Sequence, residues 1–153
     1  MIEFADAAED AVELHRLAAE AKRASYSPYS RFRVGAAVRV EDGSVFTGAN
    51  LDNASYPASG CAERSAISAA VSAGHRRVVA VAVDGDAPSV SPCGVCRQLM
   101  AEFARADAVV SYPWAGRLVS TTVGELLPHS FALDVPRDVS LDGPSDGRSD
   151  RDR

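Results

Sequence analysis

The chain has 153 residues, of which 46% are hydrophobic, and a formal net charge of −5 at pH 7. This length suffices for one domain with a sizeable core that needs no disulfides. The acidic balance provides no basic surface for phosphate groups, so polynucleotide partners are disfavoured. No apolar run approaches the roughly 20 residues that cross a bilayer, and the acidic start does not resemble a signal peptide, so we expect a cytoplasmic protein without membrane association.

The first third of the chain predicts a helix followed by a β-hairpin. Apolar residues recur at three- and four-residue spacings over residues 6–25, which is typical of an amphipathic helix. Pro28 ends this pattern, because proline disfavours helical backbone in the residue before it. Residues 32–40 and 44–49 favour strands, and Asp42-Gly43 between them is a strong tight-turn pair.

The remainder alternates helices and strands. After a loop over residues 50–60, we expect helices from Cys61 to Gly74 and over 93–106, a strand buried on both faces over 78–83, and further strands over 107–112 and 117–120. Thr122 with Glu125 is a capping-box signature for a short helix ending at Leu127. The order predicts an α/β fold over residues 1–136, a three-layer α/β/α sandwich with a mixed five-stranded sheet. Residues 137–153, rich in Asp, Arg, Ser and Gly, are expected to be disordered.

All three cysteines lie in two short segments, Cys61-Ala62-Glu63-Arg64 and Pro92-Cys93-Gly94-Val95-Cys96. Since cytosolic thiols stay reduced, this pattern favours metal binding or redox chemistry over a disulfide. Zinc suits three thiolates, which leave its fourth tetrahedral position for water, as in a catalytic site. Two of the cysteines stand at predicted helix N-termini, where the free backbone N–H groups stabilise a thiolate.

The residues beside the cysteines complete this hypothesis. Glu63, two residues after Cys61, is the expected proton carrier between water and substrate. Three thiolates give a Zn²⁺ site a formal charge of −1, so we expect Arg64 and Arg97 to offset it by donating to sulfur. Two alternatives stand: a redox-active Cys-x-x-Cys leaves Cys61 unexplained, and a structural zinc site closed by a histidine, His75 or His129, leaves Glu63 without a role.

These motifs resemble the two zinc motifs of the nucleoside cytidine deaminases, and the resemblance extends to residues 27–37, 50–57 and 126–131. It implies zinc bound by Cys61, Cys93 and Cys96, with hydrolytic attack at C4 of cytosine. Glu63 would carry protons to N3 and to the departing amine, so that a cytosine nucleoside yields the uracil nucleoside and ammonia.

The resemblance also implies the substrate contacts and the assembly. Phe32 and Ala62 would lie by the base, although the alternation of Phe32 with Val34 is equally typical of a core residue. Asn50 and Asp52 would lie at the sugar. Phe131 would stack on a base in a neighbouring subunit's site, which requires a homotetramer with shared active sites.

Two departures from the family pattern bear on the substrate. Asp52 stands where the family commonly has Glu, which shortens the side chain by about 1.5 Å, and Ala58-Ser59-Gly60 replaces larger apolar residues. The substrate is then either cytidine or 2′-deoxycytidine with a tolerated substitution, or a modified cytosine nucleoside or an aminopyrimidine-nucleoside antibiotic such as blasticidin S. A protein that binds zinc without catalysis is a further alternative, and the presence of Glu63 argues against it.

Overall fold

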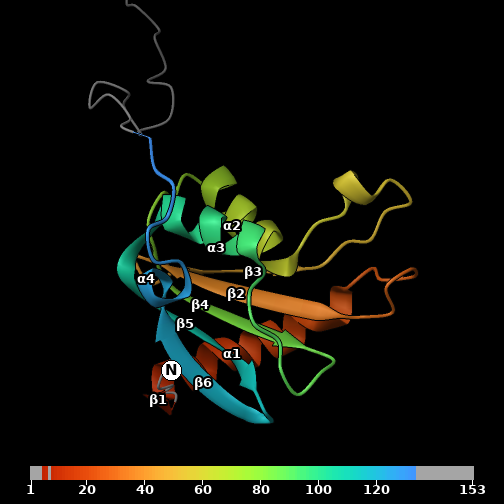
Figure 1. Cartoon of the computed structure of the whole chain (residues 1–153), viewed down its shortest axis with the longest axis horizontal. Coiled ribbons are helices and arrows are strands. Elements are labelled where there is room, and N and C mark those ends of the chain that lie inside the picture. The colour runs from red at the N-terminus through yellow and green to blue at the C-terminus, as the bar shows by residue number, and fades with distance from the viewer. Residues whose placement is uncertain (1–4, 7, 134–153) are drawn as a thin grey trace, which may run out of the picture.

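The computed structural model describes residues 5, 6 and 8–133, which form one sheet flanked by helices (Figure 1). The strands are β1 (Ala5–Asp6), β2 (Val34–Val40), β3 (Val45–Ala49), β4 (Val78–Gly85), β5 (Ala104–Trp114) and β6 (Arg117–Thr122). The helices are α1 (Glu9–Ala21), α2 (Ala62–Ser72), α3 (Gly94–Phe103) and α4 (Val123–Leu126), with single 3-10 turns η1 (Lys22–Ala24) and η2 (Tyr56–Ala58). The tail that the sequence predicts to be disordered, 137–153, lies outside the described residues.

The sheet is mixed, as predicted, with the strand order β1-β6-β5-β4-β2-β3. Strands β4 and β5 run parallel, and every other neighbouring pair is antiparallel. The five predicted strands are all present, and the two-residue β1 adds a short sixth strand beside β6. No helix in the described part of the chain has the length and apolar character needed to span a membrane.

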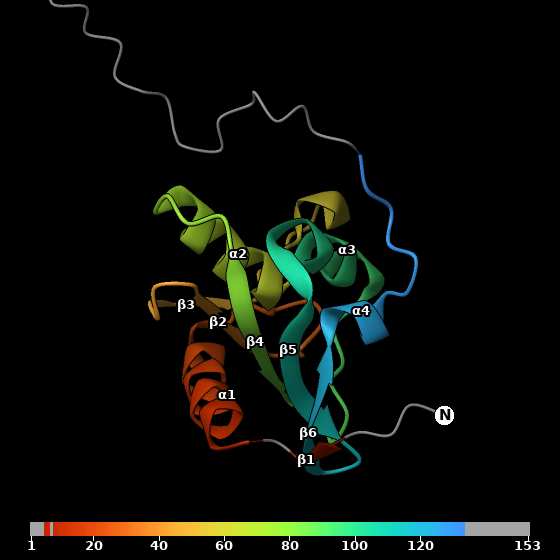
Figure 2. The ribbon, with the colours of Figure 1, turned by 90° about the vertical axis from the view of Figure 1, so that its left-hand side faces the viewer.

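The helices form a layer on each face of the sheet, which confirms the three-layer sandwich (Figure 2). Helix α1 covers one face, where a small core of Leu14, Ala18, Ala37 and Ala82 is buried. Helices α2 and α3 cover the other face over a larger core that includes Val38, Val81 and Met100. Neighbouring residues of β2 and β4 belong to different cores because side chains alternate across a strand.

Two glycines let the helices approach the sheet closely. A Cβ atom built on Gly48 of β3 would lie 2.4 Å from the backbone nitrogen of Ala66 in α2. On the other face, a Cβ on Gly35 of β2 would lie 2.1 Å from the carbonyl oxygen of Ala18 in α1. Because no side chain fits at these distances, glycine is required at both positions.

Local signals in the sequence place the hairpin and the last helix correctly. Gly43 has a φ of 88°, and Asp42 Oδ1 accepts a hydrogen bond from the Ser44 N–H at 2.9 Å, which closes the turn between β2 and β3. Thr122 and Glu125 form the predicted capping box at the start of α4, with Thr122 Oγ1 accepting from the Glu125 N–H at 3.3 Å.

The prediction for residues 93–112 was wrong at one boundary. The sequence predicts a helix through residue 106 and a strand from 107, whereas α3 ends at Phe103 and β5 begins at Ala104. The alanines at 104 and 106 are compatible with a helix, but Ala104 pairs with Val78 of β4 in the parallel ladder. Tertiary pairing therefore overrides the local helix propensity of this segment. Likewise α1 begins at Glu9, and residues 22–24 of the predicted helix form the turn η1.

Candidate active site

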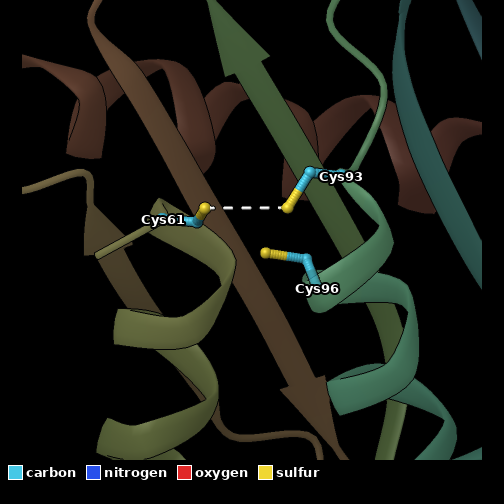
Figure 3. A group of neighbouring side chains, drawn as sticks. All are labelled: Cys61, Cys93 and Cys96. Carbon is cyan, nitrogen blue, oxygen red and sulfur yellow. Dashed lines mark hydrogen bonds between the residues drawn. The ribbon is translucent and has the colours of Figure 1, made fainter. Parts of the chain in front are cut away.

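The three cysteines converge from the starts of two neighbouring helices (Figure 3). Cys61 is the N-cap residue of α2, Cys93 is the N-cap residue of α3, and Cys96 lies in the first turn of α3. The sulfur atoms of Cys61 and Cys93 are 3.8 Å apart, and all three sulfur atoms lie within 4.8 Å of one another. Each N-cap residue has extended backbone, which turns its side chain back toward the helix start.

This geometry fits a zinc ion. Zn–S bonds of about 2.3 Å at tetrahedral angles separate sulfur atoms by about 3.8 Å. Among the described residues, the cluster consists of the three thiols and contains no histidine. His75, considered above as a closing ligand, lies beyond the other end of α2, where its ring packs on Phe46 with centroids 5.2 Å apart. The donor set is therefore that of a three-cysteine zinc site.

The thiols share their protons in a way that favours metal binding. A hydrogen bond from the Cys96 thiol lowers the pKa of Cys61 to about 6, and the charge of Arg64 acts in the same direction. The same sharing raises the pKa of Cys96, which is buried between the helices. Since a thiolate is the metal-ligating form, Cys61 is already prepared to bind.

Glu63 is buried in the first turn of α2, with 4% of its surface exposed. Burial raises the pKa of its carboxyl group, and the nearby Cys61 thiolate adds to this effect. A carboxyl group with a raised pKa can hold and release a proton closer to neutral pH than an exposed glutamate. Its location beside the thiols is that expected of the proton carrier.

A cavity of about 340 Å³ opens beside the thiols, large enough for a small organic molecule. Two of the three cysteines and Glu63 line it, together with residues from the loops before β2, after β3 and after β4. The lining residues are Ser30, Phe32, Val34, Asn50, Leu51, Asp52, Ser59, Gly60, Cys61, Ala62, Glu63, Val83, Val90, Ser91 and Cys93.

The sequence did not indicate several of these lining residues. Val83 lies near the carboxyl end of β4, and Val90 and Ser91 lie on the segment that leads from β4 to Cys93. The strand pattern signals that Val83 is buried, but not that it reaches a cavity. Ser30 belongs to the stretch 27–37 that resembles the family, but nothing in the sequence assigned it a place at the cavity. These residues come together only when the loops after β3 and β4 meet the loop before β2.

The two arginines have partners other than those predicted from charge. We expected both to donate to sulfur, but Arg64 donates from Nη2 to the backbone carbonyl of Ser59. Arg97 donates to the carbonyls of Pro92 at 2.8 Å and Leu126 at 3.1 Å. Backbone carbonyls of two segments next to cysteines and of α4 thus accept hydrogen bonds from the guanidinium groups. Each arginine braces the segment that carries a thiol, and Arg64 still acts on Cys61 through its charge.

Asn50 and Asp52 line the cavity, but their side chains bond chiefly to the opposite loop. Asn50 Nδ2 donates to the Phe32 carbonyl at 2.8 Å, and its Oδ1 accepts from the Val34 N–H at 2.8 Å and from the Ser25 hydroxyl at 2.5 Å. Asp52 accepts three hydrogen bonds from Tyr29 and Ser30. Their predicted contacts with a sugar stay predictions, and both residues have a structural task within the chain.

The remaining predicted contacts divide into two groups. Phe32 and Ala62 line the cavity, as their predicted place by the base requires. Phe131 does not line it: its side chain is 71% exposed, and its backbone carbonyl accepts a hydrogen bond from Gln98 Nε2 at 2.8 Å. The predicted role of Phe131 concerns a neighbouring subunit and stays a prediction. His129 has a positive φ of 58° in the same exposed segment.

Comparison with known proteins identifies this arrangement. The family model for the cytidine and deoxycytidylate deaminase zinc-binding region matches residues 8–112. A cytidine deaminase from Halalkalibacterium halodurans is 49% identical over 123 residues, 79% of this chain and 93% of that protein. The crystal structure of cytidine deaminase from Burkholderia pseudomallei matches with a TM-score of 0.74 and 41% identity, covering 78% of this chain and 98% of that one.

A further relative is a blasticidin-S deaminase from Bacillus cereus, 35% identical over 111 residues, 67% of this chain and 79% of that protein. Fold, thiol cluster and buried glutamate together define a zinc-dependent hydrolytic deaminase. More closely, the chain belongs to the cytidine deaminase family.

Proposed function

We propose that the protein hydrolyses the exocyclic amine of cytidine or 2′-deoxycytidine, giving the uracil nucleoside and ammonia. The observation that carries this proposal is that one cavity is lined by two of the three converging thiols, by the buried Glu63 and by Phe32. Relatives named as cytidine deaminases at up to 49% identity over most of the chain support the same reaction.

The chemistry follows from the placement of the side chains. A zinc ion held by Cys61, Cys93 and Cys96 supplies the Lewis acidity that makes water a nucleophile near neutral pH. Glu63 would accept one proton from the attacking water and deliver it to N3 of the base. It would then take the second proton from the new hydroxyl group at C4 and give it to the amine, so that the C–N bond breaks as the C4 carbonyl forms and ammonia leaves. Burial of Glu63 keeps its pKa raised, so that both transfers are accessible to one carboxyl group.

The volume of the cavity and the net charge of the chain support a small nucleoside as substrate. A cavity of about 340 Å³ lies at the lower end of the range for drug-sized ligands. The net charge of −5 gives no general attraction for a polynucleotide. Ala62, a residue with a small side chain, lines the cavity next to Cys61.

A modified cytosine nucleoside or an antibiotic such as blasticidin S is the second candidate substrate. Ser59 and Gly60 both line the cavity, so the absence of larger side chains there widens the wall next to Cys61. A Cβ atom on Gly60 would lie 3.2 Å from Arg64 Nη2, so a larger residue there would require the guanidinium group to shift by a few tenths of an ångström. The higher identity to relatives named as cytidine deaminases favours cytidine.

The proposal includes a homotetramer in the cytoplasm that serves pyrimidine salvage. Support for the assembly comes from Phe131, whose exposed side chain lies outside its own chain's cavity and is free to enter that of a neighbour. Three unpaired cysteines are consistent with a reducing compartment. Sedimentation or light scattering of wild type and Phe131→Ala tests whether the aromatic side chain supports the assembly.

The decisive experiment measures ammonia release by the zinc-loaded protein with cytidine, 2′-deoxycytidine, 5-substituted cytidines and blasticidin S. We expect kcat/KM of about 10⁴ M⁻¹s⁻¹ or more for at least one of the first two. Preference for a 5-substituted nucleoside or for the antibiotic by a factor of ten would select the second candidate. Full zinc occupancy with no deamination of any compound would contradict the proposed function.

A further inference from the structure

The guanidinium group of Arg97 contacts three oxygen acceptors at once. Its Nε donates to the Pro92 carbonyl at 2.8 Å, and its Nη1 donates to the Leu126 carbonyl at 3.1 Å. Its Nη2 donates to the Ser91 hydroxyl oxygen at 3.5 Å. A guanidinium group presents its donors in a rigid planar fork, so these acceptors are held in fixed positions relative to one another. One side chain therefore joins the segment before Cys93 to the end of α4.

The segment on one side of this guanidinium group is part of the cavity wall. Val90 and Ser91 line the cavity, immediately before Pro92 and Cys93. Pro92 is fully buried and has no backbone N–H group, so its carbonyl is the one backbone group through which it can form a hydrogen bond. The Val90 N–H donates to the Pro113 carbonyl of β5 at 2.9 Å. The wall is thus fixed to the sheet at Val90 and to α3 at Pro92.

The segment on the other side is the stretch of chain that begins at the end of α4. Leu126 is the last residue of α4, and a carbonyl group at a helix end has no partner within the helix, so Arg97 supplies one. Further along, the Phe131 carbonyl accepts a hydrogen bond at 2.8 Å from Nε2 of Gln98, the residue next to Arg97. Two consecutive side chains of α3 therefore hold residues 126–131 at both ends.

These contacts give Arg97 a task that a positive charge alone cannot perform. Its three acceptors are neutral oxygen atoms, and they are reached together because the donors of the group point in different directions. A lysine ammonium group is a single charged centre on a flexible stem and lacks this planar fork. Loss of the fork would leave the buried Pro92 carbonyl without its partner and would separate the wall from α4.

We propose that Arg97 is a positioning residue that couples residues 126–131 to the cavity wall at Ser91 and Pro92. Both segments keep their places only while the same planar group binds them. The inference rests on the proposed deaminase function for its kinetic consequence, which is a change in substrate binding. Its structural consequence does not depend on activity: removal of one side chain loosens two segments that lie far apart in the sequence.

Hydrogen exchange of the protein without substrate tests the coupling. The Val90 amide reports on the wall, and the Leu127 amide, which donates to the Val123 carbonyl at 3.0 Å, reports on the end of α4. In Arg97→Ala, we expect both amides to exchange at least about tenfold faster. Gln98→Ala leaves the guanidinium fork in place, so the Val90 amide should exchange as in the wild type. Faster exchange at only one of the two amides in Arg97→Ala would overturn the proposal.

Arg97→Lys separates the fork from the charge, and it is the milder variant if Arg97→Ala does not fold. Because lysine retains the charge but lacks the fork, we expect both amides to exchange nearly as fast as in Arg97→Ala. Arg105→Ala removes an exposed guanidinium group bonded to Asp107 and is the matched control, which should change neither amide. Wild-type exchange of both amides in Arg97→Lys would show that only the charge matters, and would refute the proposal.

Steady-state kinetics with cytidine, together with metal analysis, test the consequence for the site. We expect Arg97→Lys to retain about one zinc per chain and to raise KM about tenfold with little change in kcat, because the displaced wall weakens substrate binding. A fall in kcat at unchanged KM would contradict the positioning of a binding wall. If the zinc-loaded wild type deaminates no nucleoside, the proposed function fails, while the exchange experiment still decides what Arg97 holds.

Discussion

The two halves of the cavity wall are built by different means. The metal half consists of Cys61, Glu63 and Cys93 at the starts of α2 and α3. The loop half consists of residues 25–34 and 50–52, held together by side-chain and backbone hydrogen bonds. A helix start orients a reactive side chain through a few neighbouring residues. The loop half is instead held by hydrogen bonds between residues about 20 positions apart in the chain. Each reactive group is therefore oriented by its own helix start, and the packing of α2 beside α3 brings Cys61 and Cys93 together from 32 residues apart. The shape offered to the substrate depends on the long-range hydrogen bonds of the loop half.

Loss of one thiol should break the metal half most completely. Cys96 is buried with 1% exposure, and Cys96→Ala leaves two thiols with no further cysteine or histidine in the cluster among the described residues. We expect zinc content to fall from about one per chain to near zero, and deamination to fall by at least about 10³-fold. Metal analysis alongside ammonia release measures both. The exposed neighbour provides the control Val95→Ala, and retained zinc with retained activity in Cys96→Ala would contradict the assignment.

Removal of the proton carrier should separate catalysis from metal binding. Glu63→Gln preserves the shape of the side chain, so zinc content should stay at the wild-type level while kcat falls by about 10²- to 10⁴-fold. Glu102→Gln, an exposed position on α3, should leave both unchanged. Near wild-type kcat in Glu63→Gln would mean that this carboxyl group does not carry the proton. The metal half of the cavity wall would then bind zinc and substrate without supplying a proton carrier, and it would differ less from the loop half.

The loop half should respond in stability as well as activity. Asn50→Ala leaves the Phe32 carbonyl and the Val34 N–H without their partner, which should lower the free energy of unfolding by about 1–3 kcal/mol. Displacement of the Phe32 wall should lower kcat/KM by about 10- to 100-fold. Urea denaturation and steady-state kinetics measure the two effects. Asn53→Ala removes only a local acceptor for the Ser55 N–H and is the control; equal effects in both variants would contradict the bracing role of Asn50.

The smallest expected effect lies where the loop half meets the α1 face. Arg33 binds Asp86 at 2.8 Å, and Lys22 lies 3.3 Å from the same carboxylate and 2.6 Å from that of Asp84. The hydrogen bond from Arg33 lowers the pKa of Asp86 below its ordinary value of 3.8. A carboxyl group whose pKa is lowered by folding stabilises the folded state at pH values above its pKa in the unfolded chain. This stabilisation is lost as the pH falls through the lower pKa of the folded state.

Asp86→Asn should therefore lower the urea midpoint slightly at pH 6 and flatten its fall below about pH 4. Urea denaturation of both proteins between pH 2 and 6 measures the difference. Asp107→Asn, at a carboxylate bonded to Arg105 on an exposed part of β5, is the control for a surface ion pair. Identical acid dependence in wild type and Asp86→Asn would show that this pair does not brace the loop half.

Most of the fold was predictable because its signals are local. The Asp42-Gly43 turn, the apolar run of β4 and the Thr122–Glu125 capping box each specify structure within a few residues. The end of α3 was not predictable in this way. Ala104 favours a helix locally, and only its pairing with Val78 makes it the first residue of a strand.

The residues of the site also differ in how far the sequence predicts their roles. Three cysteines in two short motifs, with Glu63 beside one of them, are enough to predict a zinc-dependent proton transfer, because helix starts fix side chains relative to one another. The sequence predicts that Arg64 and Arg97 donate to sulfur, whereas in the structure both guanidinium groups donate to backbone carbonyls, those of Ser59, Pro92 and Leu126. Sequence cannot rank such acceptors, since they meet only after the loops have packed.

By itself, the sequence determined the reactive groups, their order along the chain and the family to which they point. The tertiary structure decided what Asn50 and Asp52 hold and which residues complete the cavity. The physical reason is the range of the interactions. A thiol at a helix start is oriented by its own turn, whereas the turn before Phe32 is held by the carboxylate of Asp52, 22 residues beyond Ser30.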